Sequence, residues 1–230
     1  MSRSNPTQSN PARYFYRWSG SKGELSYYDK EKQVEVPVEL PFHFLVLDEL
    51  ATITGFCEQD GSQYWSNEVR SVAREELIVK TSAGTKQTGL YKDLADVRSK
   101  GAKYAKSIYI AHYDGHEMVI ANIKAHGAAL TAWIELSSRH KVENGKVVLT
   151  GTEKGKKGAT EYFIPKFEYQ ASDPQDDEKA IELDRQLQQH LSQYLTKRTT
   201  QSELDSLAAT YGDGLATEDI DSLDLSAIPF

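Results

Sequence analysis

The chain has a single cysteine, Cys57, among 230 residues. One cysteine forms no disulfide within the chain and supplies no cysteine-based zinc site, so we expect a reducing, cytoplasmic setting. Long apolar runs are also missing, and none approaches the roughly 18–20 residues that cross a bilayer. The segment from Met1 to Arg13 is rich in Ser, Asn and Pro and lacks the apolar centre of a signal peptide. We therefore expect no membrane association and a flexible arm over residues 1–12.

Basic residues are missing from the end of the chain. Residues 199–230 contain seven acidic side chains and no Lys or Arg. The chain has 34 acids and 27 bases, so 34 − 7 leaves 27 acids against 27 bases in residues 1–198. The body is therefore neutral, and the excess negative charge predicts a disordered acidic tail over residues 199–230. An acidic chain of this kind can still contain a basic surface for nucleic acid.

The hydrophobic pattern predicts a mainly β body. Alternating or β-rich patterns, which favour strands, occur over residues 13–40, 42–58, 63–71, 77–81, 86–91, 107–113, 117–124, 146–150 and 160–169. Turn signals at Asp60-Gly61 and Asp114-Gly115 predict hairpins. Apolar residues at helical spacing predict helices over residues 94–105 and 128–138.

The clearest helix is expected over residues 172–198. Asp173 is suited to cap it, and Pro174 fits its first position. One apolar stripe runs along it and consists of Leu183, Leu187, Leu191 and Leu195. Such a stripe suits packing onto the body or onto a second copy of the chain, so monomer and homo-oligomer both stay open.

The order of elements between residues 42 and 124 is three strand segments, a helix and two further strands. An OB-fold, a five-stranded barrel with a helix between its third and fourth strands, has the same order. Unrelated folds share it too. We expect an α+β, mainly β fold, with an OB-like domain within residues 13–171. That domain would be elaborated by an N-terminal hairpin, a C-terminal hairpin and helices.

The chain ends in Ile228-Pro229-Phe230, and the residues before this tip include Asp219, Asp221 and Asp224. This end resembles the C-terminal tip of bacterial single-stranded DNA-binding proteins, in which acidic residues precede Ile-Pro-Phe. The chain is also similar to the phage-encoded proteins of this class, which join an OB-type body to an acidic tail closed by an aromatic residue. In this chain residues 225–227 separate the acids from the tip.

The resemblance implies a body that coats and protects single-stranded DNA in replication and recombination, without catalysis or a cofactor. It also implies a tail that recruits replication, recombination and repair proteins. Physical chemistry supports a partner-binding tip. Phe230 offers an aromatic ring and an α-carboxylate together, which an apolar pocket with a basic lip recognises. Pro229 restricts the backbone and lowers the cost of ordering it.

Single strands are bound by cations that contact phosphates and by aromatic rings that stack on bases. Residues 86–106 hold six bases against two acids, and an expected loop over residues 154–158 holds three lysines. The candidate phosphate contacts are Lys86, Lys92, Arg98, Lys100, Lys103, Lys106, Lys154, Lys156 and Lys157. The candidate stacking residues are Tyr14, Tyr16, Trp18, Tyr64, Trp65, Tyr109 and Tyr113. For each ring the competing interpretation is burial in the core, and for each basic cluster it is a solvated surface.

Two other classes of function stay open. An interaction protein would use the tip to recruit or sequester host replication proteins without binding DNA itself. A metal-dependent nuclease would need ligands, and the densest cluster is His112, Asp114, His116 and Glu117. A two-residue turn spreads these side chains apart, so we expect a polar hairpin end and no metal site. The sequence contains no P-loop, serine-hydrolase or zinc-protease motif, and we expect no catalysis.

Overall fold

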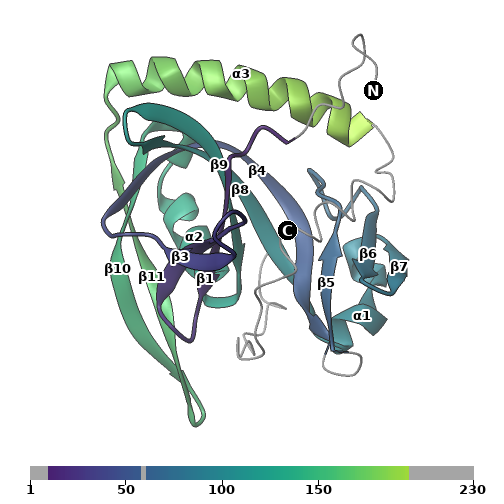
Figure 1. Ribbon diagram of the computed structural model, residues 1–230. Helices are drawn as coiled ribbons and strands as arrows, with labels where there is room; N and C mark the ends of the chain where they lie inside the picture. Colours follow the sequence, from purple (N-terminus) through teal and green to yellow (C-terminus); the bar gives the residue numbers. More distant parts are fainter. Residues whose placement is uncertain (1–9, 58–60, 197–230) are drawn as a thin grey trace.

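The computed structural model describes residues 10–57 and 61–196. Within them the fold is α+β and mainly β, with eleven strands in one mixed sheet. The strands are β1 (Tyr14–Ser19), β2 (Glu24–Asp29), β3 (Val34–Pro37), β4 (Phe42–Cys57), β5 (Ser62–Ser66), β6 (Leu77–Thr81), β7 (Gly84–Gly89), β8 (Ala102–Asp114), β9 (Glu117–His126), β10 (Lys146–Lys157) and β11 (Thr160–Gln170). The helices are η1 (Tyr91–Asp93), α1 (Ala95–Ser99), α2 (Gly127–Arg139), η2 (Val142–Asn144) and α3 (Pro174–Thr196) (Figure 1). None of these helices is long and apolar enough to span a bilayer.

The long strand β4 connects the whole sheet. It pairs with β8 along most of its length, with β10 at its first end and with β5 at its last end. The strand order is β3-β2-β1-β9-β8-β4-β5-β6-β7, and the β10–β11 hairpin branches from β4. These pairings are antiparallel, apart from the parallel pair of β1 and β9. A register shift between Val46 and Asp48 interrupts the ladder of β4 with β8.

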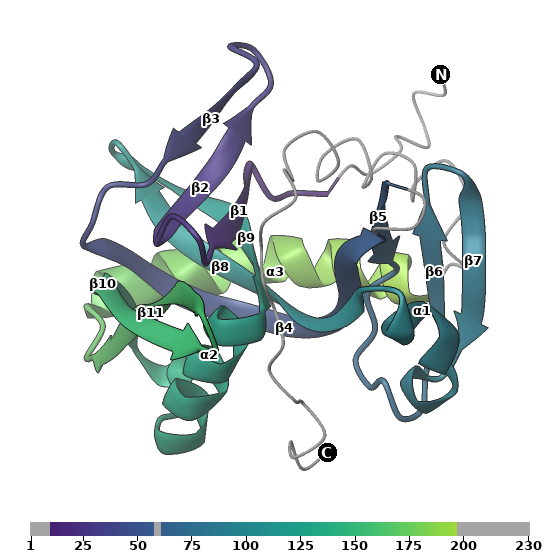
Figure 2. The ribbon, with the colours of Figure 1, turned by 90° about the horizontal axis from the view of Figure 1, so that it is seen from below.

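The expected five-stranded barrel is not confirmed. The strands that would close it, β6 and β9, pair with β7 and β1 instead of with each other. The sheet is therefore open. Figure 2 shows β4 running between two groups of elements, with β5, β6, β7 and α1 at one end and β1–β3, β10, β11 and α2 at the other.

Two hydrophobic cores correspond to these two groups. The larger core packs α2 and the β10–β11 hairpin against β1, β4, β8 and β9, and includes Phe44, Ile108 and Trp133. The smaller core gathers residues of β4, β5, β6, β8 and α1 and of the segment between β5 and β6, among them Leu77 and Val97. Because β4 and β8 contribute to both cores, the two groups share one sheet.

Helix α3 covers the face of the sheet opposite α2. Leu187 and Leu191 are buried in a cluster with Leu50 and Tyr109, and the other two leucines of the stripe pack at its edge. The predicted stripe is therefore confirmed as the packing face of α3 on its own sheet. The predicted cap also forms, because Oδ1 of Asp173 accepts a hydrogen bond of 2.8 Å from a backbone N–H in the first turn. Lys197 and Arg198, the expected end of this helix, lie outside the described residues.

The hairpin predicted across Asp114-Gly115 is confirmed as β8 and β9, and the helix predicted over residues 128–138 is confirmed as α2. The helix predicted over residues 94–105 is much shorter, because α1 ends at Ser99 and β8 begins at Ala102. Gly101 separates them with a φ of 108°. A Cβ there would lie 2.0 Å from the carbonyl oxygen of Phe56, so only glycine allows this approach.

Two further expectations are corrected. The residues expected as a cationic loop belong to β10, which continues to Lys157 and pairs with β11 to the end of the hairpin. The end of the expected N-terminal arm is packed, because Ala12 is buried in the cluster beneath α3 and the N–H of Arg13 bonds to the carbonyl of Ile120. Residues 1–9 lie outside the described part of the chain.

Polar side chains are buried on the face of the sheet that α3 covers. The carboxylate of Glu68 accepts hydrogen bonds from the hydroxyls of Ser107 and Tyr109, and Ser107 in turn accepts one from Asn122 at 2.7 Å. The backbone N–H of Glu68 bonds to the hydroxyl of Tyr194 in α3 at 2.9 Å. Burial lowers the pKa of Lys124 to about 8, and the charge of Glu68 opposes this shift.

The lowered pKa of Lys124 predicts a pH-dependent stability. Between the folded pKa of about 8 and the unfolded value of 10.5, only the unfolded chain keeps the proton, so stability rises with pH. The free energy of unfolding should therefore increase by about 2 kcal/mol from pH 8 to pH 10, relative to Lys124→Met. Urea unfolding of both proteins at each pH measures this difference. Parallel pH profiles for the two proteins would contradict the assignment.

Candidate nucleic-acid interface

Charge is unevenly distributed over the described part of the chain. Helix α3 holds five acids and two bases. The six bases of residues 86–106, here called the α1 cluster, lie on β7, η1 and α1, at the C-cap of α1 and on the first half of β8. The hairpin cluster, which is Lys154, Lys156 and Lys157, lies at the free end of β10. In Figure 1, α3 lies along the top, the free end of the hairpin lies at the bottom and α1 lies at the lower right.

The six bases of the α1 cluster differ in their exposure to solvent. Lys86, Lys92 and Arg98 are exposed, and the other three bases are half-buried. Lys100 forms an ion pair of 3.0 Å with Asp96, one turn earlier. Exposed pairs of this kind exchange readily with water and with other anions, because each contributes little to stability.

Two tyrosines and an arginine form a contact beside α1. The guanidinium carbon of Arg98 lies 4.5 Å from the ring centre of Tyr91, which is a cation–π geometry. The rings of Tyr91 and Tyr104 meet edge to face with centres 5.6 Å apart. Both rings are half-buried. Burial, with smaller effects of Glu49 and Tyr91, raises the pKa of the Tyr104 phenol to about 12, so it stays a neutral hydrogen-bond donor at physiological pH.

Sequence reasoning missed these two rings. Tyr91 stood at the end of an expected strand, and Tyr104 was assigned to an expected helix. Tyr104, Lys106 and Ile108 would share one face of a strand, but a tyrosine, a lysine and an isoleucine on one face form no apolar pattern that indicates a strand. In β8 the alternation of side chains between the two faces places Tyr104 and Lys106 on one face.

Lys106 is held by an acid on the neighbouring strand. Glu49 accepts a hydrogen bond of 2.5 Å from Nζ of Lys106 and one of 2.9 Å from Nε1 of Trp133 in α2. The pair is only partly exposed, so the carboxylate fixes the lysine side chain beside Tyr104. Lys106 is thus held at a defined position, with its charge balanced by Glu49.

The hairpin cluster is fully at the surface. Lys154, Lys156 and Lys157 are all exposed, and Nζ of Lys154 lies 5.9 Å from the ring centre of Phe163 on β11. Because successive residues of a strand point to opposite faces, Lys154 and Lys156 share one face and Lys157 lies on the other. The end of the hairpin is therefore cationic on both sides.

Most of the expected stacking residues are core residues. The exposed fractions are 3% for Tyr16, 6% for Trp18, 3% for Tyr64, 7% for Trp65 and 2% for Tyr109. A ring sealed on both sides offers no face to a base. The structure thus supports the core interpretation for these five rings. Tyr14 is half-buried, and Tyr113, at 42%, is exposed.

The position of α3 explains why the tyrosines of β8 are engaged. Tyr109 and Tyr113 lie on the face opposite Ile108 and Ile110, as the period of two predicts. Helix α3 covers that face. Tyr109 bonds to Glu68, while the hydroxyl of Tyr113 bonds to Asp176 and accepts a bond from Lys179, each at 2.8 Å.

The polar end of the β8–β9 hairpin is bound to the N-terminal segment. Arg13 forms ion pairs with Asp114 at 3.3 Å and with Glu117 at 2.8 Å, and Tyr14 donates a hydrogen bond to Asp114. The buried ring of His112 contacts the hydroxyl of Tyr16 at 3.0 Å. In the described residues no group of three or more His, Cys, Asp or Glu side chains is arranged to hold a metal ion.

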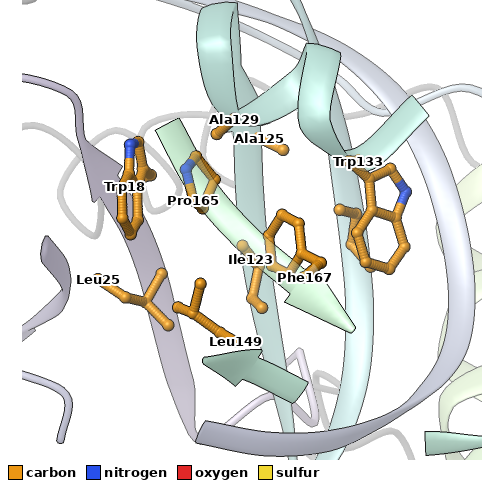
Figure 3. Close-up of a pocket in the computed structure, with 10 residues that line it drawn as sticks. Trp18, Leu25, Ile123, Ala125, Ala129, Trp133, Leu149, Pro165 and Phe167 are labelled. Atoms are coloured by element: carbon orange, nitrogen blue, oxygen red, sulfur yellow. The ribbon is translucent and has the colours of Figure 1, made fainter. Parts of the chain in front are cut away.

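An apolar pocket lies inside the larger core, with Trp18, Trp133 and Phe167 among the residues around it (Figure 3). Every residue that lines it is apolar, so it carries no group for acid–base or metal chemistry. It lies between the β10–β11 hairpin, α2 and strands β1, β2, β8 and β9. The expected partner-binding residues Asp219, Asp221, Asp224, Ile228, Pro229 and Phe230 lie outside the described part of the chain.

Comparison of the chain with models of protein families, with curated proteins and with solved structures finds no match.

The hydrogen bonds of Glu49 predict that its replacement lowers stability more than the replacement of an exposed glutamate. Glu49→Ala removes the acceptor of the Trp133 indole and the partner of Lys106, and an unsatisfied buried donor costs about 1–3 kcal/mol. We expect a lower midpoint of urea unfolding and a shifted tryptophan emission spectrum. Glu135→Ala, which breaks an exposed ion pair with Arg139, is the matched control and should change the midpoint little. Equal effects of the two substitutions would contradict the structural role of Glu49.

Proposed function

We propose that this protein binds single-stranded DNA without sequence preference and recruits replication, recombination and repair proteins through its C-terminal tip. The observation that carries the proposal is the contact of Arg98, Tyr91 and Tyr104 within a cluster of bases. A single strand needs positive charge for its phosphates and aromatic faces for its bases. This part of the surface supplies both.

The charge distribution supports the proposal. DNA is attracted to regions of positive potential even where a protein is negative overall. The α1 cluster and the hairpin cluster are basic, whereas α3, which holds five acids, lies across the top of Figure 1, away from α1 and from the free end of the hairpin. A single-stranded DNA that approaches either cluster would therefore contact positively charged side chains.

The arrangement of β4 to β9 supports a relation to OB-folds. Here β4 lies between β5 and β8, β5 continues to β6, and β8 continues to β9. We propose that these five strands form an opened OB-like unit, whose last strand pairs with the added strand β1. The curved faces and loops of OB-folds commonly bind single strands.

The end of the chain supports the partner-binding role. Its acids and its Ile-Pro-Phe tip resemble the tip of bacterial single-stranded DNA-binding proteins, as described above. Acidic residues attract a basic pocket over a distance limited by salt, and the terminal ring and carboxylate would provide the specific contact.

Binding to oligo(dT) tests the DNA-binding role. We expect quenching of intrinsic fluorescence by oligo(dT) at about 50 mM salt and weaker affinity as salt rises. Arg98→Ala should weaken binding, because it removes a phosphate contact and leaves Tyr91 without its cation. Arg185→Ala, which removes an exposed arginine from α3, is the matched control and should leave the affinity unchanged. Equal losses for the two variants would contradict this location of the interface.

No binding at about 50 mM salt would reject DNA binding, because electrostatic contacts are strongest at low salt. That result would favour the second candidate, an interaction protein that uses the tip without binding DNA. The burial of five expected stacking rings is the observation in its favour. Capture of replication or repair proteins by the isolated tail, with a body inert to oligonucleotides, is the result that this candidate requires.

Removal of residues 199–230 should separate the two roles. We expect the shortened chain to keep or increase its affinity for oligo(dT), since seven acids that repel DNA are removed. It should lose capture of replication and repair proteins, and Phe230→Ala in the full chain should show the same loss with unchanged DNA affinity. A shortened chain that stays folded, by circular dichroism, but no longer binds DNA would contradict this division of roles.

A further inference from the structure

The outer half of the β10–β11 hairpin is fixed to the body by one residue of β11. The backbone N–H of Phe163 bonds to the carbonyl of Gly20 at 2.7 Å, and the carbonyl of Phe163 accepts a bond of 3.1 Å from the indole of Trp18. Its ring packs on Gly23 so closely that a Cβ there would lie 2.8 Å from Cγ of Phe163. The backbone next to Tyr162 is therefore held in place.

Tyr162 lies on the other face of the hairpin, since neighbouring strand residues point in opposite directions. Its partner across the two strands is Gly155. A Cβ on Gly155 would lie 2.6 Å from both Cε2 and Cζ of the Tyr162 ring. The ring thus occupies the space where the side chain of residue 155 would stand. Tyr162 is half-buried in this position, so part of its side chain stays open to solvent.

The residues of β10 beside this ring are polar. On the Tyr162 face of β10, the residues on either side of Gly155 are Lys157 and Glu153. Lys157 is exposed, and Lys166 lies 3.9 Å from the carboxylate of Glu153 and offsets its charge. The other two lysines of the hairpin cluster lie on the opposite face. An exposed lysine therefore stands next to a ring whose position is already fixed.

We propose that Tyr162 is a stacking platform for one unpaired base and that Lys157 contacts a neighbouring phosphate. This inference rests on the proposed binding of single-stranded DNA and adds a second contact, on the hairpin, to the one beside α1. The ligand class is an unpaired nucleotide, because a base within a duplex has both faces occupied by its neighbours. Gly155 is a positioning residue, since any side chain there displaces the ring.

Affinity for oligo(dT), measured with the full chain, tests the platform. Tyr162→Leu should weaken binding roughly 5- to 150-fold, the range that corresponds to one stacked base. Tyr162→Phe keeps the ring and should stay within about twofold of the parent protein. Gly155→Val, which suits a strand but fills the space of the ring, should weaken binding with Tyr162 still present. Lys157→Ala should reduce the slope of log affinity against log salt concentration by about one, the effect of one lost phosphate contact. Tyr162→Leu should leave this slope unchanged.

Photocross-linking provides a readout that a purely structural role would not give. An oligonucleotide with 5-iododeoxyuridine should cross-link to the peptide that contains Tyr162, and the cross-link should vanish in Tyr162→Leu. Duplex DNA of the same length should bind the parent protein and Tyr162→Leu equally. If the parent protein binds oligo(dT) while Tyr162→Leu binds equally well and no cross-link forms at this peptide, the platform is rejected and DNA binding stands. If the parent protein binds no oligonucleotide, both proposals are rejected.

Discussion

The pairing of β4 with β8 is the constraint on which the rest of the structure depends. It runs from Leu45 opposite Ala111 to Gly55 opposite Ala102, and its last step requires two glycines. A Cβ on Gly55 would lie 2.1 Å from the carbonyl oxygen of Gly101, and a Cβ on Gly101 would lie 2.0 Å from that of Phe56. This approach sets where α1 ends and β8 begins. It therefore also sets how Arg98 of α1 is placed relative to Tyr104 of β8.

Local signals were sufficient for the elements whose structure depends on near neighbours. The turn at Asp114-Gly115, the α2 helix and the cap at Asp173 all follow from patterns within a few residues. The length of α1 did not, because the sequence alone indicates that Gly101 is a costly interruption within a helix and not the end of one. Its role depends on Phe56, which lies 45 residues earlier in the chain and comes close only when the sheet has formed. Whether the sheet closes into a barrel also depends on a distant segment, because β1 pairs with the edge of β9 where β6 would have to pair.

The same distinction applies to the candidate site. The basic clusters were found from sequence because exposed charge needs no partner to be recognised. The rings were not, because alternation predicts which face of a strand a side chain takes but not what covers that face. Tyr109 points away from the isoleucines as expected and is then sealed by α3. Tyr162 carries no local signal, since its position is set by Gly155 on the adjacent strand.

The distance between the acids of α3 and the basic clusters limits how strongly they affect one another. Sheets that pack face to face lie about 10 Å apart, which sets the scale of one layer, and electrostatic interactions are screened over about 8 Å at physiological salt. The acids of α3 therefore subtract little from the potential at the opposite face under those conditions. At low salt their reach lengthens, and they would oppose the proposed attraction of DNA to the basic clusters. Salt would thus act on the proposed binding in two opposite ways, because it weakens phosphate contacts while screening the repulsion. The phosphate contacts would dominate, because they are made at close range and release counterions from the DNA.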